Sequence, residues 1–188
     1  MEDFPIQNVF YFIGLLILLR GTFYMVKQKH AVIIERLGKF NKVSKAGLHL
    51  KIPFIDVIAG NVNLRVRELP VEVETKTKDD VFVRIVVSVQ FFVIAAVEGV
   101  KDSFYELNNP EQQIQSYVFD SIRSEVPLME LDDVFAEKEK IALAVQNELS
   151  GTMRQFGFDF IKALVTDIDP DAKVKHSMNE INAAKRMK

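Results

Sequence analysis

The chain has 188 residues, and its 48% hydrophobic content is enough to build one substantial domain or two small ones, which excludes a disordered chain. Its 24 Lys and Arg against 26 Asp and Glu exclude the net basic field that typically accompanies nucleic-acid binding. There is no cysteine and residue 2 is Glu, so we expect no disulfides, thiolate chemistry, palmitoylation or N-myristoylation.

An unbroken apolar run, VFYFIGLLILL, occupies residues 9–19. As a helix, the uncharged stretch 4–19 would extend about 24 Å, less than a hydrocarbon core of ~30 Å. Continued through residues 23–26 it would span, with the stem of Arg20 carrying its guanidinium to the headgroups. We predict a membrane anchor over residues 1–25, built from an apolar series and one terminal cation: Val9, Phe10, Phe12, Ile13, Leu15, Leu16, Ile17, Leu18, Leu19 and Arg20.

Two other interpretations of this run stay open, a secretory signal peptide and a buried core helix. The acidic start, with Glu2 and Asp3, and the lack of a small-residue cleavage motif disfavour the signal peptide. Five Lys or Arg follow the run between residues 20 and 39 and none precedes it. By the positive-inside rule, the bulk of the chain should lie on the cytoplasmic side of a plasma or inner membrane.

Residues 26–108 are predicted to form a β-rich subdomain. The first strand and its hairpin cover 26–40 with a turn at Gly38, and a second strand covers 47–52 and ends at Pro53. A third strand is expected over 63–74, where Val71 and Val73 alternate with glutamates.

The strongest local pattern lies in residues 81–93, where every odd position is apolar and several even positions are polar. This alternation predicts a long antiparallel strand with one buried face. The polar segment 78–80 should turn it back onto the strand that contains Val71.

Residues 109–170 are predicted to form an α/β subdomain. A 3.6-residue period predicts a helix from Pro110 to Val126, with Pro in its first turn. A second helix should open near Asp132 or Asp133 and end at Gly157, since glycine suits the left-handed C-terminal position. A strand is expected over 158–168.

Residues 171–188 are predicted to begin a coiled-coil helix. Its apolar residues are spaced by four, three and three, as in a coiled-coil seam, and are the candidate oligomerisation residues: Val174, Met178, Ile181 and Ala184. An ordinary amphipathic helix docked on its own domain fits this spacing equally well.

The sequence offers no catalytic, cofactor or metal motif. The carboxylates of Asp167, Asp169 and Asp171 alternate as at the start of an EF-hand loop, but the loop's glycine and its final glutamate are missing. Capping of the following helix explains these carboxylates better than calcium binding. We therefore expect a non-enzyme with no cofactor.

Several motifs resemble the SPFH or band 7 superfamily, which includes stomatins, prohibitins and flotillins. These are GLH at 47–49 leading to Pro53-Phe54, TKDDV at 77–81, QIQSYVFD at 113–120 and MNEINAA at 178–184; the last two resemble the hypersensitive-induced-reaction branch. The resemblance implies an α+β fold with an N-terminal membrane helix, an antiparallel SPFH1 subdomain, an α/β SPFH2 subdomain and the start of a C-terminal coiled coil.

The resemblance also implies a non-enzymatic membrane scaffold that assembles laterally as a homo-oligomer and organises membrane microdomains. Its expected partners are membrane lipids and a membrane protease, channel or receptor, and not nucleic acid. The alternative is an adaptor that regulates one channel, transporter or protease without a large assembly, through the 72–76 face or the second helix. Plant members of the branch usually begin Met-Gly and are acylated, whereas this chain has Glu2 and an apolar run.

Overall fold

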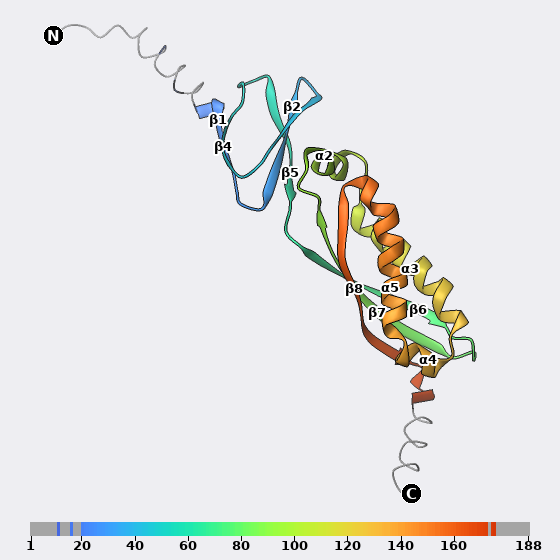
Figure 1. Ribbon diagram of the computed structural model, residues 1–188. Coiled ribbons are helices and arrows are strands. Elements are labelled where there is room, and N and C mark those ends of the chain that lie inside the picture. Colours follow the sequence, from blue (N-terminus) through green and yellow to red (C-terminus); the bar gives the residue numbers. More distant parts are fainter. Residues whose placement is uncertain (1–10, 12–15, 17–19, 173, 176–188) are drawn as a thin grey trace, which may run out of the picture. The chain divides into compact units, whose positions relative to one another are not determined.

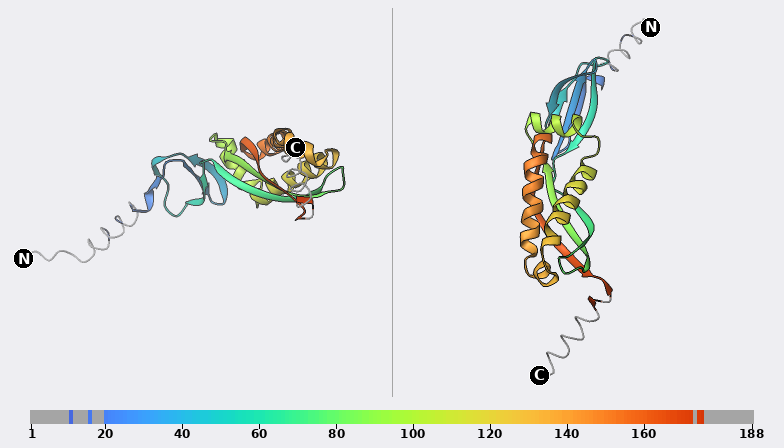
Figure 2. Two further views of the ribbon diagram at one scale, coloured as in Figure 1. Left: turned by 90° about the horizontal axis from the view of Figure 1, so that it is seen from below. Right: turned by 90° about the vertical axis from the view of Figure 1, so that its right-hand side faces the viewer.

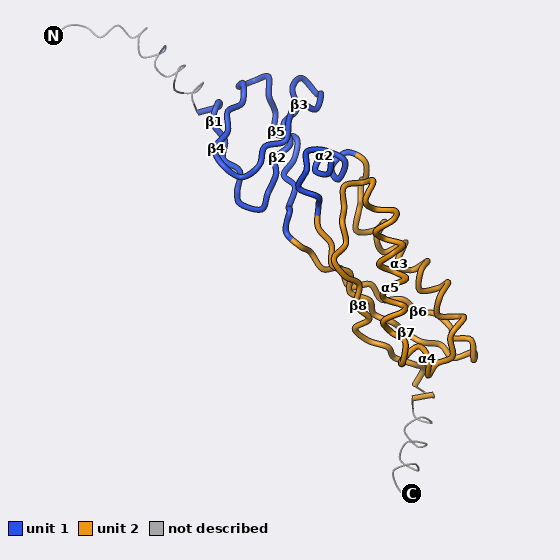
Figure 3. Tube along the Cα trace, in the orientation of Figure 1, with its two compact units in different colours: residues 1–65, 93–105 blue, residues 66–92, 106–188 orange. Residues whose placement is uncertain are grey.

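The computed structural model describes residues 11, 16, 20–172, 174 and 175 (Figure 1). The chain divides into two compact units, one of residues 1–65 and 93–105 and the other of residues 66–92 and 106–188 (Figure 3). The antiparallel strands and helices confirm the predicted α+β class. The subdomain division at residues 108 and 109 stays a prediction.

From residue 23 onward, the described part of the first unit contains two small antiparallel sheets and helix α2. Its elements are β1 (Phe23–Val26), β2 (His30–Arg36), β3 (Lys39–Ser44), β4 (Gly47–Leu50), β5 (Asp56–Asn63) and α2 (Val97–Tyr105). β1 pairs with β4, and β2 lies between β3 and β5. Four consecutive buried residues, Ala31 to Ile34, make β2 the centre of this unit.

The predicted hairpin at Gly38 is confirmed. Leu37 and Gly38 both have positive φ, as the central residues of a type I′ turn require. Strand β5 and helix α2 were not predicted. β5 does not alternate, since Val57 and Ile58 are both exposed, and α2 has only nine residues.

Helix α2 docks on the sheet of the first unit through its last two residues. The Tyr105 hydroxyl donates a hydrogen bond of 2.6 Å to the Glu35 carboxylate, and its ring meets Phe40 edge-on. Burial and this hydrogen bond raise the pKa of Tyr105 to about 12. The Phe104 ring occupies the space where a side chain on Gly60 would lie.

We expect Gly99→Ala in α2 to lower the free energy of unfolding by about 1–3 kcal/mol, because overpacking forces the backbone to shift. A Cβ there would lie 2.6 Å from the Ile94 carbonyl oxygen. Gly151→Ala in the second unit is the matched control: a Cβ there meets nothing within 4 Å, and helix propensity should add about 0.5–1 kcal/mol. Urea unfolding measures both, and equal effects would contradict the packing at Gly99.

The second unit is a three-stranded sheet with two long helices on one face (Figure 2, right). Its elements are β6 (Arg67–Lys76), β7 (Phe82–Val93), α3 (Pro110–Glu125), α4 (Leu131–Ala136), α5 (Lys138–Met153), β8 (Phe158–Pro170) and the 3-10 turns Val126–Leu128 and Arg154–Phe156. The strand order is β6-β7-β8. β8 runs antiparallel to β7, since the Asp171 amide donates to the Phe82 carbonyl while Phe160 stacks on Phe91.

The alternation predicted for β7 is confirmed. The odd-numbered residues from 83 to 93 are all buried, and β6 pairs as expected, with Val71 opposite Val87. The helices close this core with apolar side chains at helical spacing: Ile114, Val118 and Ile122 of α3, and Ile141, Val145, Leu149 and Met153 of α5.

The helix predicted from Pro110 is confirmed, and the Asn109 side chain accepts a hydrogen bond from the Gln112 amide as its N-cap. The prediction of a single second helix is wrong. The chain leaves helical geometry at Glu137 and forms α4 and α5. Gly157 has a φ of 79°, in the left-handed position predicted for it.

Most residues of the two predicted terminal sites lie outside the described part of the chain. Of the anchor series, Leu16 and Arg20 are described, and both are helical. Of the seam, Val174 is described, while Met178, Ile181 and Ala184 are not. Within the described residues, no helix has the length and apolar character to cross a membrane.

Candidate functional site

An exposed apolar face lies on the β1–β4 ribbon, directly after the N-terminal apolar run. Its members are four side chains exposed by half or more: Phe23, Met25, Leu48 and Leu50. The register places Phe23 opposite Leu50 and Met25 opposite Leu48. Successive residues of a strand point to opposite faces, so these four side chains share one side of the ribbon.

The other side of the ribbon packs against its own unit, and these contacts prevent it from becoming the exposed side. The Tyr24 ring stacks on His49 with centroids 5.6 Å apart, and its hydroxyl is hydrogen-bonded to Ser44. Val26 joins Val32 and Ile34 in a small core. A one-residue slip would bury the apolar face and break these contacts, so the register fixes which face is presented outward.

The ribbon corrects one prediction from the sequence. The predicted anchor extended to residue 25, and a full span needed the helix to continue through residues 23–26, but these four residues form strand β1. Pairing with β4 explains the difference, because four β1 residues meet four β4 residues across an antiparallel ladder. The exposed face itself was missed, although the alternation Phe23, Met25 and Leu48, Leu50 is visible in the sequence.

The loop after β4 exposes a further apolar side chain, that of Phe54, and is held by an ion pair with a buried carboxylate. Phe54, at 85% exposure, has a φ of 68°. The Arg36 guanidinium makes two hydrogen bonds to the Asp56 carboxylate, of 2.7 and 3.2 Å, and the Ile52 amide donates to the same group. The bond from Arg36, with that from Ile52, lowers the pKa of Asp56 to about 2.

We expect Asp56→Asn to lower the stability of the first unit and to remove a pH dependence. The folded pKa of about 2 is below the ordinary 3.8, so the stabilisation is complete above 3.8 and is lost as the pH falls toward 2. The difference in unfolding free energy between wild type and variant should therefore shrink across that window. A difference that stays constant from pH 5 to about 2 would contradict the ion pair.

The charges of the chain are strongly segregated. Residues 20–65 contain nine Lys or Arg and two Asp or Glu, a net charge of +7, whereas residues 66–188 contain fifteen and twenty-two, a net charge of −7. Basic segments next to a membrane helix are attracted to anionic headgroups. The apolar face and the positive charge thus occur in the same unit.

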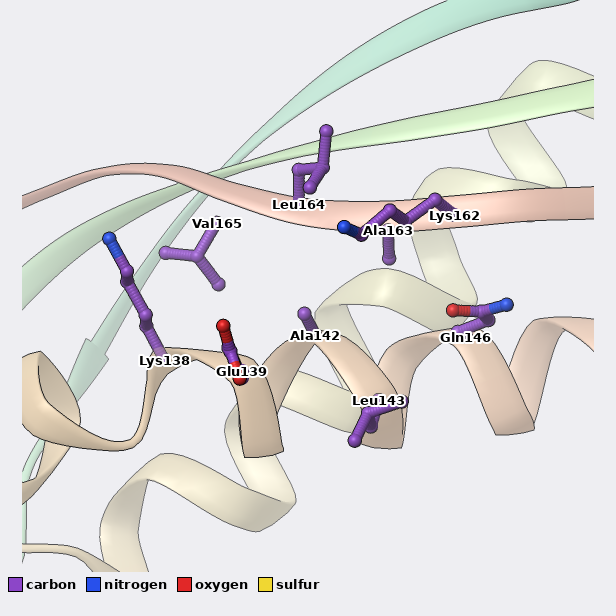
Figure 4. A pocket seen from close by; sticks show the side chains of 9 residues that line it. All are labelled: Lys138, Glu139, Ala142, Leu143, Gln146, Lys162, Ala163, Leu164 and Val165. Atoms are coloured by element: carbon purple, nitrogen blue, oxygen red, sulfur yellow. The ribbon is translucent and has the colours of Figure 1, made fainter.

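A groove lies between α5 and β8 in the second unit (Figure 4). It has a volume of 340 Å³, and five apolar residues contribute to its lining: Ala142, Leu143, Ala163, Leu164 and Val165. Lys138 and Lys162 contribute two cations to the lining, and Glu139 contributes one carboxylate. β8 is an outer strand of the sheet, so this groove borders a sheet edge.

The opposite edge of the sheet, strand β6, has a net charge of −1, because its three glutamates are accompanied by Arg67 and Lys76. Glu68, Glu72 and Glu74 are all exposed on it. Glu72 is paired with Arg84, which also contacts Asp169 at 3.1 Å. Lys175 completes this network, and the hydrogen bonds from Lys175 and Arg84 lower the pKa of Asp169.

These ion pairs explain the role of Asp169, the middle one of the three alternating aspartates that were considered as calcium ligands. The Asp169 carboxylate is already engaged by two cations, those of Arg84 and Lys175. Among the described residues, no three His, Cys, Asp or Glu side chains come together as a metal site would require.

Comparisons with known proteins agree with this fold. The SPFH domain / Band 7 family matches residues 24–188. The chain is 42% identical to hypersensitive-induced response protein 4 of Arabidopsis thaliana over 163 residues, 86% of this chain and 55% of that protein. It is 29% identical to stomatin-like protein stl-1 of Caenorhabditis elegans over 166 residues, 87% of this chain and 49% of the relative. The chain spans about half the length of these two relatives, and it belongs to the SPFH domain / Band 7 family.

Proposed function

We propose that this protein is a non-enzymatic membrane scaffold that assembles laterally with copies of itself on the cytoplasmic side of a membrane and organises the lipids and membrane proteins around it. The observation that carries the proposal is the exposed apolar face of the β1–β4 ribbon, next to the apolar run 9–19. A monomeric soluble domain rarely leaves such a cluster uncovered. Contact with the bilayer covers it.

Lateral assembly is supported by the two outer strands of the second unit. β8, with its groove and two lysines, and β6, with its three glutamates, are opposite ends of the order β6-β7-β8. The groove side of one copy therefore complements the β6 side of the next in charge. Such a head-to-tail contact repeats, and it gives a ring if the rotation closes. Confinement to one membrane raises the effective concentration, so weak contacts add up.

Disulfide trapping in membranes tests this contact, because the chain contains no native cysteine. Glu74→Cys and Lys162→Cys are made in separate chains, and both sites are exposed. A head-to-tail contact predicts disulfide dimers when the two variants are mixed, few dimers from either alone, and a ladder of multimers from the double variant.

Two outcomes would contradict the scaffold. The first is absence of cross-links in the mixture, together with a monomer at every concentration in detergent. The second is a single one-to-one complex with a channel, transporter or protease, which would favour the adaptor alternative. The matched control is Gln155→Cys, which is exposed in the 3-10 turn after α5, outside the groove, and should not cross-link with Glu74→Cys.

A further inference from the structure

A cavity of 280 Å³ in the first unit collects three cations from separate segments. Arg36 comes from β2, Lys42 from β3, and Lys51 directly follows β4. One carboxylate, that of Asp56, shares the lining. The cavity therefore has a net charge of +2, and the membrane scaffold proposed above does not use it.

The carboxylate does not cancel the attraction of this cavity for an anion. The Asp56 side chain is only 2% exposed and is neutralised by the bidentate contact with Arg36. A guanidinium has five N–H donors, and this contact uses two of them. The face of the cavity that an incoming ligand meets is therefore cationic.

The two lysines are held at the cavity by backbone carbonyl groups. The Lys42 ammonium donates to the Leu50 carbonyl at 3.0 Å, and that of Lys51 to the Asp56 carbonyl at 3.4 Å. Each ammonium has three donors, so two remain for a ligand. Cationic donors of this kind bind phosphate oxygens through charge-assisted hydrogen bonds.

The rest of the lining indicates where the phosphate comes from. Leu50 and Ile52 are both in the lining and about half exposed, and Leu50 also belongs to the apolar face of the ribbon. Thr22 lines the cavity only three residues after the apolar run ends. A headgroup in this cavity would have apolar surface beside it for its acyl chains.

We propose that this cavity binds the phosphate group of an anionic membrane lipid through Lys42, Lys51 and the remaining donors of Arg36. The proposal rests on the membrane contact of the proposed function and is independent of lateral assembly. Because the cavity is positive, it should prefer phosphatidic acid to phosphatidylcholine, whose choline compensates the phosphate charge.

The test uses the full chain in detergent micelles, titrated with short-chain phosphatidic acid, short-chain phosphatidylcholine or inorganic phosphate. The readout is the amide chemical shift of Thr22, Lys51 and Ile52. We expect saturable shifts with phosphatidic acid and much weaker ones with the other two probes. Lys42→Gln with Lys51→Gln keeps hydrogen-bonding side chains and removes both charges, and it should weaken binding about tenfold or more.

Lys39→Gln with Lys45→Gln is the matched control, since it removes two exposed charges of the same unit outside the lining. This pair should keep nearly the wild-type affinity, because neither ammonium lines the cavity and salt screens exposed charges. Equal losses in the two pairs, or equal shifts with phosphatidylcholine, would overturn the proposal. Equal affinity for inorganic phosphate would overturn the lipid as the source. The cross-linking of Glu74→Cys with Lys162→Cys is repeated in chains that also carry Lys42→Gln and Lys51→Gln. This measurement tests lateral assembly independently of lipid binding.

Discussion

Phe91→Ala is expected to lower the free energy of unfolding by about 3–5 kcal/mol, the usual loss for a fully buried aromatic ring. Phe91 is 1% exposed, and its ring lies 6.1 Å from that of Phe158 and 5.9 Å from that of Phe160. The Arg67 guanidinium stands over the same ring at 4.7 Å. Truncation leaves a cavity that these neighbours fill only in part. Urea unfolding in detergent, followed by circular dichroism, measures the loss.

Phe92→Ala is the matched control, because it removes the same side chain one residue further along β7. Phe92 points to the other face of the sheet and is half-buried, so its loss should be clearly smaller. Similar losses at the two positions would mean that the strand does not have the observed inward and outward alternation.

A fluorophore on the β1–β4 ribbon is expected to report contact with lipid. Leu48→Cys, labelled with an environment-sensitive dye in this cysteine-free chain, should shift its emission to the blue in vesicles and be quenched by brominated acyl chains. The reason is that Leu48 is 68% exposed on the apolar face. Adding Met25→Glu, directly opposite in the register, should reverse much of this shift, because a charge near the hydrocarbon is costly.

Lys39→Cys with the same dye is the control for the ribbon experiment. Lys39 is exposed on β3 and lies outside the apolar face, so its emission should change little on vesicle binding. If the two labels respond alike, or if Met25→Glu leaves the Leu48 signal unchanged, the ribbon does not contact the bilayer. Emission is measured only on labelled protein that floats with the vesicles. A variant that fails to bind the membrane is thereby distinguished from one that binds but does not place the ribbon in contact with lipid.

Local patterns were sufficient where burial on one face controls the choice of residues. Every odd position of β7 had to be apolar to face the helices, and the turn at 78–80 returned the chain to Val71 as expected. The sequence also predicted helix α3, because an N-cap residue, a proline in the first turn and a 3.6-residue apolar period all indicate a helix at this place. Two of the motifs behind the family resemblance, those at 77–81 and 113–120, lie in the same regions, and the resemblance is confirmed.

Long-range contacts decided the elements that the sequence did not reveal. The Asp79 carboxylate accepts a hydrogen bond from the Leu131 amide, 52 residues away, and so helps to set where α4 starts. Residues 23–26 have the apolar character of a membrane helix, yet pairing with β4 makes them a strand. The cationic cavity likewise needs segments that no local pattern joins. Composition and periodicity thus determined the class and the main strand, and the resemblance of several motifs indicated the family. Pairing between distant segments decided which apolar and charged side chains face outward.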